Sequence, residues 1–232
     1  MPTPRQKRRT RRLRQIRDEA MALIVRDGID SFSIHALADR LDLTPGALYR
    51  YYDSRDAILA AVEVEVLEAF DAYFQALARR TADEGGLRRL VIFAAGYMAL
   101  QDLQPERFRL ISQFVAGPDP ILDDALAADV VGPTLRVVGH FVTALDVAAG
   151  DGGLGDGDAM TRAALTWSSL QGLINHRKLT RLPQVPLDPD ALFNELLTAL
   201  FTGWGAPPES LTEALQGRPD LDFFATVLEE SS

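Results

Sequence analysis

The sequence predicts an all-α protein built from two domains. Apolar residues recur at helical spacing in most segments, and Ser, Thr, Asp, Pro and Gly stand at the expected helix ends. No run of alternating apolar and polar residues stands out as a strand. The length of 232 residues, with 47% hydrophobic and 25% charged residues, fits one or two folded domains with a substantial core.

Four helices are predicted in the first third of the chain. The first, about 8–27, carries an apolar stripe and ends before Gly28, a typical residue after a helix C-terminus. Good N-caps then precede the second helix, about 34–41, the third, about 45–51, and a fourth that starts after Ser54 and carries an apolar stripe to Leu77. Thr44-Pro45 is the clearest of these starts, because proline fits the first helical position.

The rest of the chain also predicts helices, interrupted by Gly, Pro and Asp clusters. The expected spans are about 86–102, 105–115, 120–148, 157–180 and 189–203, followed by two short helices at 209–216 and 220–229. Asp188-Pro189 is another cap followed by proline. The segment 205–232 could pack on the body of the protein or cross to a partner, and the sequence leaves both open.

Charge is distributed unevenly along the chain. Residues 1–62 carry 12 basic and 8 acidic side chains, net +4, whereas residues 63–232 carry 12 and 25, net −13. The first 17 residues hold eight basic side chains and no acidic one. This pattern fits one end that meets a polyanion, and it equally fits a solvated basic tail.

The residues and motifs that are missing from the sequence argue against several functional classes. The absence of Cys excludes disulfides, thiolate metal sites and a Cys nucleophile. No run of 18 apolar residues predicts a membrane span, and Ala20–Val25 is too short for a signal peptide, so we expect a cytoplasmic protein without membrane contact. Nucleotide, dinucleotide, metalloprotease and hydrolase motifs are missing, so we expect neither an enzyme nor a cofactor. The Gly/Asp stretch 150–158 lacks calcium-loop spacing and favours a flexible loop.

Residues 34–51 predict two short helices joined by a tight turn, which makes a helix-turn-helix with the helix before them. The second helix of such a pair enters the DNA major groove. The turn requires one residue at positive φ, and Asp42 tolerates that conformation better than most residues.

Residues 8–62 closely resemble the DNA-binding domain of TetR-type transcriptional regulators. The shared features are the Gly28-Ile29…Phe32-Ser33 start, the Leu37-Ala38 pair, the Leu48-Tyr49…Tyr51-Tyr52 end and the Ser54-Arg55-Asp56 start of the next helix. Asp42 replaces the usual turn glycine, and Tyr51-Tyr52 stands where His-Phe is commoner. The resemblance implies a DNA-binding domain over residues 1–62 and a helical dimerisation and effector domain over 63–232.

The resemblance also implies which residues face DNA: Thr44, Pro45, Gly46, Ala47, Tyr49 and Arg50, with phosphate contacts from Tyr51, Arg55, Ser33 and His35. Arg50 is the best candidate to bind a guanine edge, although a phosphate contact or a solvated side chain fits it as well. The rings of Tyr49 and Tyr51 could instead pack, and His35 could be an uninvolved surface residue. The basic arm is expected to add phosphate or minor-groove contacts through Arg8, Arg9, Arg11 and Arg12.

For the acidic body, the resemblance implies a dimer interface and a small-molecule pocket. Candidate interface residues lie on the two last long helices: Ala164, Leu165, Leu173, Leu196, Leu197, Leu200 and Phe201. Candidate pocket residues combine aromatic and polar groups: Phe93, Tyr97, Phe114, His140, Phe141, Trp167 and Gln171. Ordinary core packing is the alternative for every residue of both sets.

The function implied is that of a sequence-specific DNA-binding regulator. The expected form is a ligand-responsive repressor that binds a palindromic operator as a homodimer, with double-stranded DNA and an unidentified small-molecule effector as its partners. One alternative is a DNA-binding regulator whose body binds a protein. A more remote alternative is an all-helical enzyme with a spatially assembled site.

Overall fold

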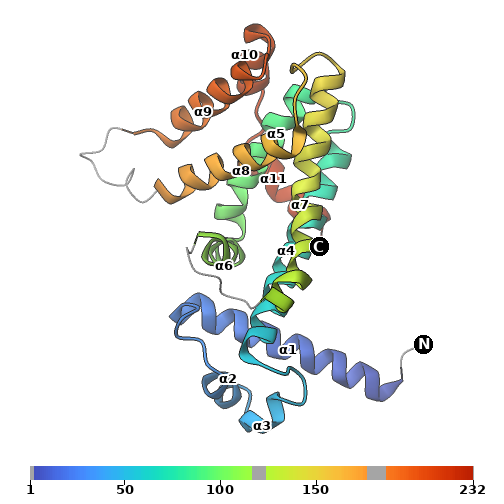
Figure 1. Cartoon of the computed structure of the whole chain (residues 1–232), viewed down its shortest axis with the longest axis vertical. Helices are drawn as coiled ribbons and strands as arrows, with labels where there is room; N and C mark the ends of the chain where they lie inside the picture. Colours follow the sequence, from blue (N-terminus) through green and yellow to red (C-terminus); the bar gives the residue numbers. More distant parts are fainter. Residues whose placement is uncertain (1–2, 117–123, 177–186, 232) are drawn as a thin grey trace. The chain divides into compact units, whose positions relative to one another are not determined.

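All regular secondary structure in the described part of the chain is helical, which confirms the predicted fold class (Figure 1). The structure is a computed structural model that describes residues 3–116, 124–176 and 187–231, without the side chains of 113–116, 124 and 125. The helices are α1 (Pro4–Asp27), α2 (Ile34–Arg40), α3 (Pro45–Leu48), α4 (Arg55–Arg80), α5 (Gly86–Leu103), α6 (Pro105–Ala116), α7 (Asp124–Gly150), α8 (Ala159–His176), α9 (Pro189–Gly203), α10 (Pro208–Gln216) and α11 (Leu221–Glu230).

The chain divides into two compact units, each made of two segments. The first unit comprises residues 1–68 and 104–134, and the second comprises residues 69–103 and 135–232. Because α4 and α7 are long helices, each of them contributes one part to each unit. The contacts within each unit are described separately below.

The first unit encloses a small apolar core between α1, α2, α3 and the first half of α4. Ile16, Leu37, Leu48 and Ile58 come from these four helices, and each is at most 1% exposed. Helix α6 packs on α1, and the Arg109 Nη1 group donates a hydrogen bond to the carbonyl of Val25 at 3.2 Å. The DNA-binding segment identified in the sequence is therefore supported by a helix that lies much later in the chain.

The second unit has an aromatic core. Phe74 on α4 contacts Phe93 on α5 and Phe141 on α7, with ring centroids 5.7 and 5.4 Å apart. Phe93 and Phe141 also meet edge to face at 5.9 Å. Because aromatic rings bury large apolar areas, this cluster anchors α4, α5 and α7 to one another.

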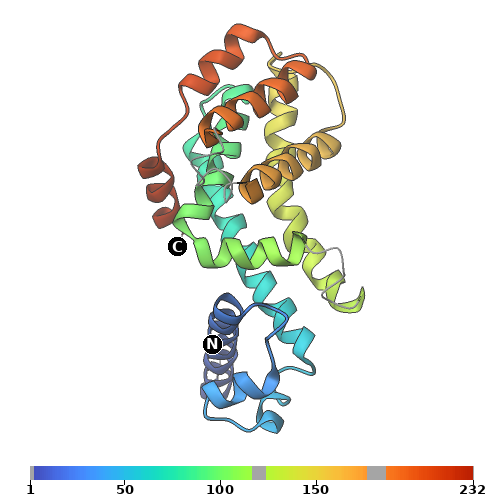
Figure 2. The same cartoon turned by 90° about the vertical axis from the view of Figure 1, so that its left-hand side faces the viewer.

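The C-terminal segment packs on the body of its own chain. Helix α10 contacts α5 and α9, and α11 contacts α5 (Figure 2). Phe224 of α11 lies against Gly96, where an added Cβ would stand 3.4 Å from the Phe224 ring. Arg80 on α4 also pairs with Glu230 at 2.6 Å. Of the two placements that the sequence left open, the structure shows packing on the same chain.

Two helix boundaries differ from the predicted ones for local reasons. Helix α1 begins at Pro4, not near residue 8, because Thr3 and Gln6 form a capping box around its first turn. Helix α3 ends at Leu48, and the amides of Tyr51 and Tyr52 both bond to the Leu48 carbonyl in a tightened turn. The predicted end of α8, residues 177–180, lies outside the described residues.

The segment Leu126–Gly150 of α7 has the length and mean hydropathy, 1.2, of a weak candidate for a bilayer span. A core helix of a water-soluble protein meets the same criteria. Arg136 and His140 on this helix both pair with Asp71 of α4, at 3.2 and 2.7 Å. These polar contacts are typical of a helix that packs inside a folded protein.

Candidate nucleic-acid interface

The turn between α2 and α3 has the conformation that the sequence predicted. Asp42 has a φ of 53°, the single non-glycine residue with positive φ in the described chain. The reversal lets the Leu43 amide donate to the Ala38 carbonyl at 2.9 Å. The chain therefore turns from α2 into α3 without a glycine at the turn position.

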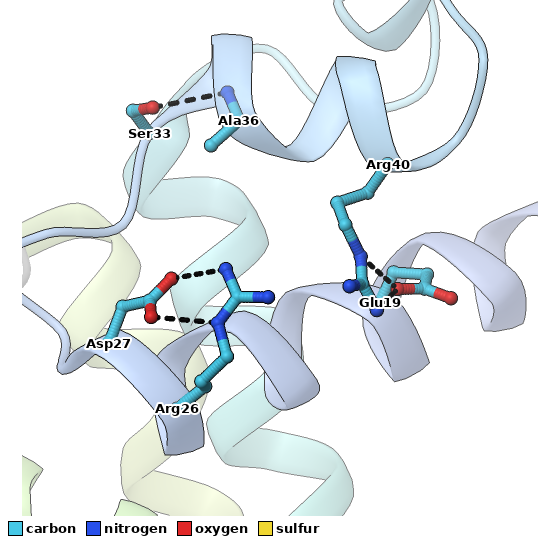
Figure 3. Close-up of polar contacts among 6 residues, drawn as sticks. All are labelled: Glu19, Arg26, Asp27, Ser33, Ala36 and Arg40. Carbon is cyan, nitrogen blue, oxygen red and sulfur yellow. Dashed lines mark hydrogen bonds and ion pairs between the residues drawn. The ribbon is translucent and has the colours of Figure 1, made fainter.

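Helix α2 has a polar contact at each end, and the one at its C-terminal end joins it to α1 (Figure 3). The Arg40 Nη2 group lies 2.9 Å from Glu19 Oε2 on α1. At the other end, Ser33 Oγ accepts a hydrogen bond from the Ala36 amide at 3.2 Å, so Ser33 caps α2 as predicted. The Ser33 hydroxyl can still donate its own proton, and His35, two residues further on, is exposed.

Helix α3 presents one side to solvent and inserts the other into the core. Thr44 caps it, with Oγ1 accepting from the Ala47 amide at 3.2 Å. Ala47 is only 7% exposed and Leu48 is buried, whereas Tyr49 is 50% exposed and Arg50 is also exposed. An added Cβ at Gly46 would meet no atom within 4 Å, so this backbone position is open to a ligand. The exposed surface thus consists of Thr44, Gly46, Tyr49 and Arg50, with Pro45 half-buried.

Arg55 has a structural role that its sequence position did not reveal. Its Nε donates to the Phe32 carbonyl at 2.9 Å, and its Nη2 donates to the Ile29 carbonyl at 2.6 Å. Its Nη1 pairs with Asp56 at 3.2 Å. Two of the five guanidinium N–H donors therefore hold the loop between α1 and α2, a third pairs with Asp56 on α4, and two remain for a phosphate.

The basic arm is part of α1 rather than an irregular tail. Arg8, Arg9 and Arg11 are exposed and Arg12 is half-buried, and all four lie within the helix. The Arg9 guanidinium lies over the Tyr51 ring, 5.8 Å from its centroid. This contact places the beginning of α1 next to the residues that follow α3.

Glu63 on α4 is a buried carboxyl group of the first unit that sequence reasoning missed. It is 9% exposed, and burial raises its pKa from an ordinary value of 4.5 to about 7. Its neighbours Val62 and Val64 give no hint of this burial.

The predicted pocket residues of the second unit fall into two groups. Phe93, Phe141 and His140 surround Phe74, with the His140 ring 6.1 Å from the Phe74 ring. Tyr97, Trp167 and Gln171 form a hydrogen-bonded chain described below. Phe114 lies on α6, and its side chain is outside the described residues.

His140 is also part of a charge cluster with Asp71. Burial alone would raise the pKa of Asp71, but hydrogen bonds from His140, Gln75 and Arg136 outweigh burial and hold the pKa below its usual value. The Asp71 carboxylate therefore stays ionised and satisfied by its neighbours. His140 is thus placed as a partner of Asp71 at the edge of the aromatic core.

The polar chain joins α5 to α8 within the core. The Trp167 Nε1 group donates to the Tyr97 hydroxyl at 3.0 Å, and the Tyr97 hydroxyl donates to Gln171 Oε1 at 2.7 Å. Tyr97 and Gln171 are buried, and burial raises the pKa of the Tyr97 hydroxyl far above its usual value. Neither of the two described clefts, of about 340 and 370 Å³, is lined by these residues.

The predicted interface residues on α8 and α9 also divide by burial. Ala164 and Leu165 are exposed, and Leu173, Leu196 and Leu200 are half-buried. Leu197 and Phe201 are fully buried, so in this chain they pack into the core of the second unit. The exposed members are available to a second copy, and the buried ones are not.

Comparison with known proteins identifies the family. Residues 16–62 match the family described as bacterial regulatory proteins, tetR family, and residues 90–200 match the tetracyclin repressor-like C-terminal domain. The chain belongs to the TetR family. An uncharacterized HTH-type transcriptional regulator of Mycobacterium tuberculosis, Rv0681, is 26% identical over 188 residues, which is 79% of this chain and 77% of that protein.

Solved TetR-like structures share the fold. FadR of Bacillus subtilis, solved with stearoyl-CoA, superposes with a TM-score of 0.63 at 15% identity, over 82% of this chain and 97% of that one. AibR, solved with isovaleryl coenzyme A and operator DNA, gives a TM-score of 0.60 at 17% identity, over 82% and 98% of the two chains. This TetR-family chain is therefore a transcriptional regulator with a DNA-binding helix-turn-helix.

Proposed function

We propose that this protein is a cytoplasmic, ligand-responsive repressor that binds a palindromic operator as a homodimer. The observation that carries the DNA-reading part is the exposed surface of α3. Thr44 just before α3, and Tyr49 and Arg50 just after it, face solvent, while Ala47 and Leu48 anchor the helix in the core. A short helix that is anchored by buried residues and flanked by exposed polar ones is suited to enter a major groove.

Arg50 is proposed as the residue that reads a base. Its exposed guanidinium can form two parallel hydrogen bonds to guanine O6 and N7, which no other exposed side chain of residues 44–50 can do. Tyr49, Tyr51, Ser33, His35 and the two remaining donors of Arg55 are proposed to bind phosphates. These contacts fix the position of α3 on the duplex but carry no sequence information.

The test is selection of random duplex DNA by the purified full-length protein, read by sequencing. We expect an enriched inverted repeat, because two copies would each place an α3 in a major groove. Arg50→Ala should lose the preference at one position per half of the repeat and cost about 1–3 kcal/mol there. Full retention of the preference by Arg50→Ala would remove Arg50 as a base reader, and no enrichment by folded wild-type protein would contradict the function itself.

The effector is proposed to be a small molecule with an apolar part and a polar group that reaches Tyr97, Trp167 and Gln171. Support comes from their buried hydrogen-bonded chain and from two fold relatives solved with acyl-CoA ligands. An effector releases the operator only if it binds one conformation of the repressor more tightly than the other. Thermal unfolding with a panel of acyl-CoA compounds, followed by operator release, tests this, and compounds that stabilise without releasing DNA would contradict the regulatory role.

A further inference from the structure

The first half of α1 is an exposed basic helix. Every residue from Thr3 to Arg11 is exposed, and the helix begins with a capping box in which the Thr3 amide donates to Gln6 Oε1 at 2.7 Å. A capped helix holds its side chains at fixed angles, about 100° per residue. The basic residues of this segment therefore point in defined directions.

Those directions place six of the basic residues in two opposite stripes, with Arg8 between them. Arg5, Arg9 and Arg12, called here the inner triplet, lie within about 40° of the buried Ile16 around the helix axis. Lys7, Arg11 and Arg14, called here the outer triplet, lie on the opposite side. Both triplets carry three positive charges within the same stretch of helix.

The inner triplet continues the side of α1 that packs on the rest of the first unit. Its central member, Arg9, lies over the ring of Tyr51, three residues beyond the end of α3. The acidic groups of α1 before residue 20 are Asp18 and Glu19, and Glu19 already pairs with Arg40 at 2.9 Å. Arg5, Arg9 and Arg12 form no ion pair with an acidic side chain of the described residues, so their counter-charges are expected from outside the chain.

We propose that the inner triplet binds phosphodiester groups of DNA immediately beside the half of the operator that α3 enters, and that the outer triplet does not. The proposal rests on the proposed function and adds a second, flanking contact to it. Guanidinium groups bind phosphate oxygens in paired hydrogen bonds. Arg5 and Arg12 are seven residues apart, about 10 Å along the helix, which is close to the rise of three base steps at about 3.4 Å each.

The proposal differs from a general attraction between a basic tail and DNA. A disordered tail would act through the number of its charges, so the two triplets would be equivalent. A helix fixed at Tyr51 acts through its orientation, so the triplet on the Tyr51 side would account for the phosphate contacts. The two triplets therefore form a matched pair of variants.

The experiment compares the full-length chain with Arg5→Gln/Arg9→Gln/Arg12→Gln and with Lys7→Gln/Arg11→Gln/Arg14→Gln. Circular dichroism and thermal unfolding confirm that both variants fold. Binding to the selected operator is measured by fluorescence anisotropy over a range of salt concentrations. Each lost phosphate contact reduces the slope of log K against log salt by about 0.9, so the inner-triplet variant should lose about 2.7 per bound copy and the outer-triplet variant less than about 1.

A shortened duplex provides a second measurement. On an operator trimmed to the ends of the α3 half-sites, the wild type should bind with the slope of the inner-triplet variant. Equal slopes for the two variants would overturn the proposal while leaving the proposed function intact. If the wild type selects no sequence, the proposed function fails, and the slopes on an unselected duplex still decide between the two triplets.

Discussion

Glu63 is the residue whose environment has the clearest thermodynamic consequence. Burial on α4 raises its pKa to about 7 from 4.5, so the folded state favours the protonated form. Between these two pKa values the folded chain binds more protons at this site than the unfolded chain. The contribution of Glu63 to stability therefore falls as pH rises from about 4.5 to about 7, and stays low above that range.

Replacing Glu63 with Gln should remove this dependence. Glu63→Gln is expected to unfold with nearly the wild-type free energy at pH 5 and to be more stable by about 2–3 kcal/mol at pH 8. Urea unfolding of both proteins at the two pH values measures the difference. A variant that is equally destabilised at both pH values would show that the carboxyl group is stabilised by specific contacts instead.

Asp42 and Arg55 illustrate which residue properties the sequence could predict. The positive φ of Asp42 follows from the local requirement of a tight turn, and the structure confirms it at 53°. The contacts of Arg55 with the Ile29 and Phe32 carbonyls bring together residues more than 20 positions apart. The local sequence was therefore enough to predict the positive φ of Asp42. The contacts of Arg55 could not be predicted, because they depend on how α4 packs on the α1–α2 loop.

At the scale of elements, the packing of α11 on α5 can be tested by a single substitution. Phe224 is 3% exposed and contacts the α5 position of Gly96, and Val227 is fully buried. Phe224→Ala should destabilise the second unit by about 3–5 kcal/mol, because it removes a buried ring and leaves a cavity. Thermal unfolding measures the loss, with Phe223→Ala on the half-buried side of α11 as the matched control. Equal effects of the two substitutions would contradict the packing of α11 by Phe224.

Most helices could be predicted because their starts carry local signals. Ser33, Thr44 and Asp188 each cap the helix that the sequence placed after them. The early start of α1 was missed because the arginine run has no apolar periodicity, although Thr3-Pro4 and Gln6 carry a capping-box signature. The association of α6 with α1 could not be predicted, because it depends on long-range packing.

At the scale of the whole molecule, the proposed homodimer places two α3 helices on one operator. Leu165 on α8 is 48% exposed beside the exposed Ala164, which fits an apolar contact with a second copy. Leu165→Glu should halve the mass measured by light scattering after size exclusion, because it would bury an unpaired charge in the interface. Leu221→Glu replaces an equally exposed leucine, at 47%, on α11 and should leave the mass unchanged. A wild-type protein that is already monomeric would contradict the dimer.

Each of the two units combines segments that lie far apart in the sequence and are therefore synthesised at different times. The first unit includes residues 104–134, and the second unit has α11 packed on α5, which precedes it by six helices. Domains generally fold as units while the ribosome is still adding residues. Here the helix-turn-helix segment leaves the ribosome long before its supporting helix α6, and the second unit gains Phe224 and Val227 only after α5 to α10 have been made. Each unit of this regulator is thus completed only when a segment from much later in the sequence has been made, which favours folding of the two units after synthesis of α6 and α11.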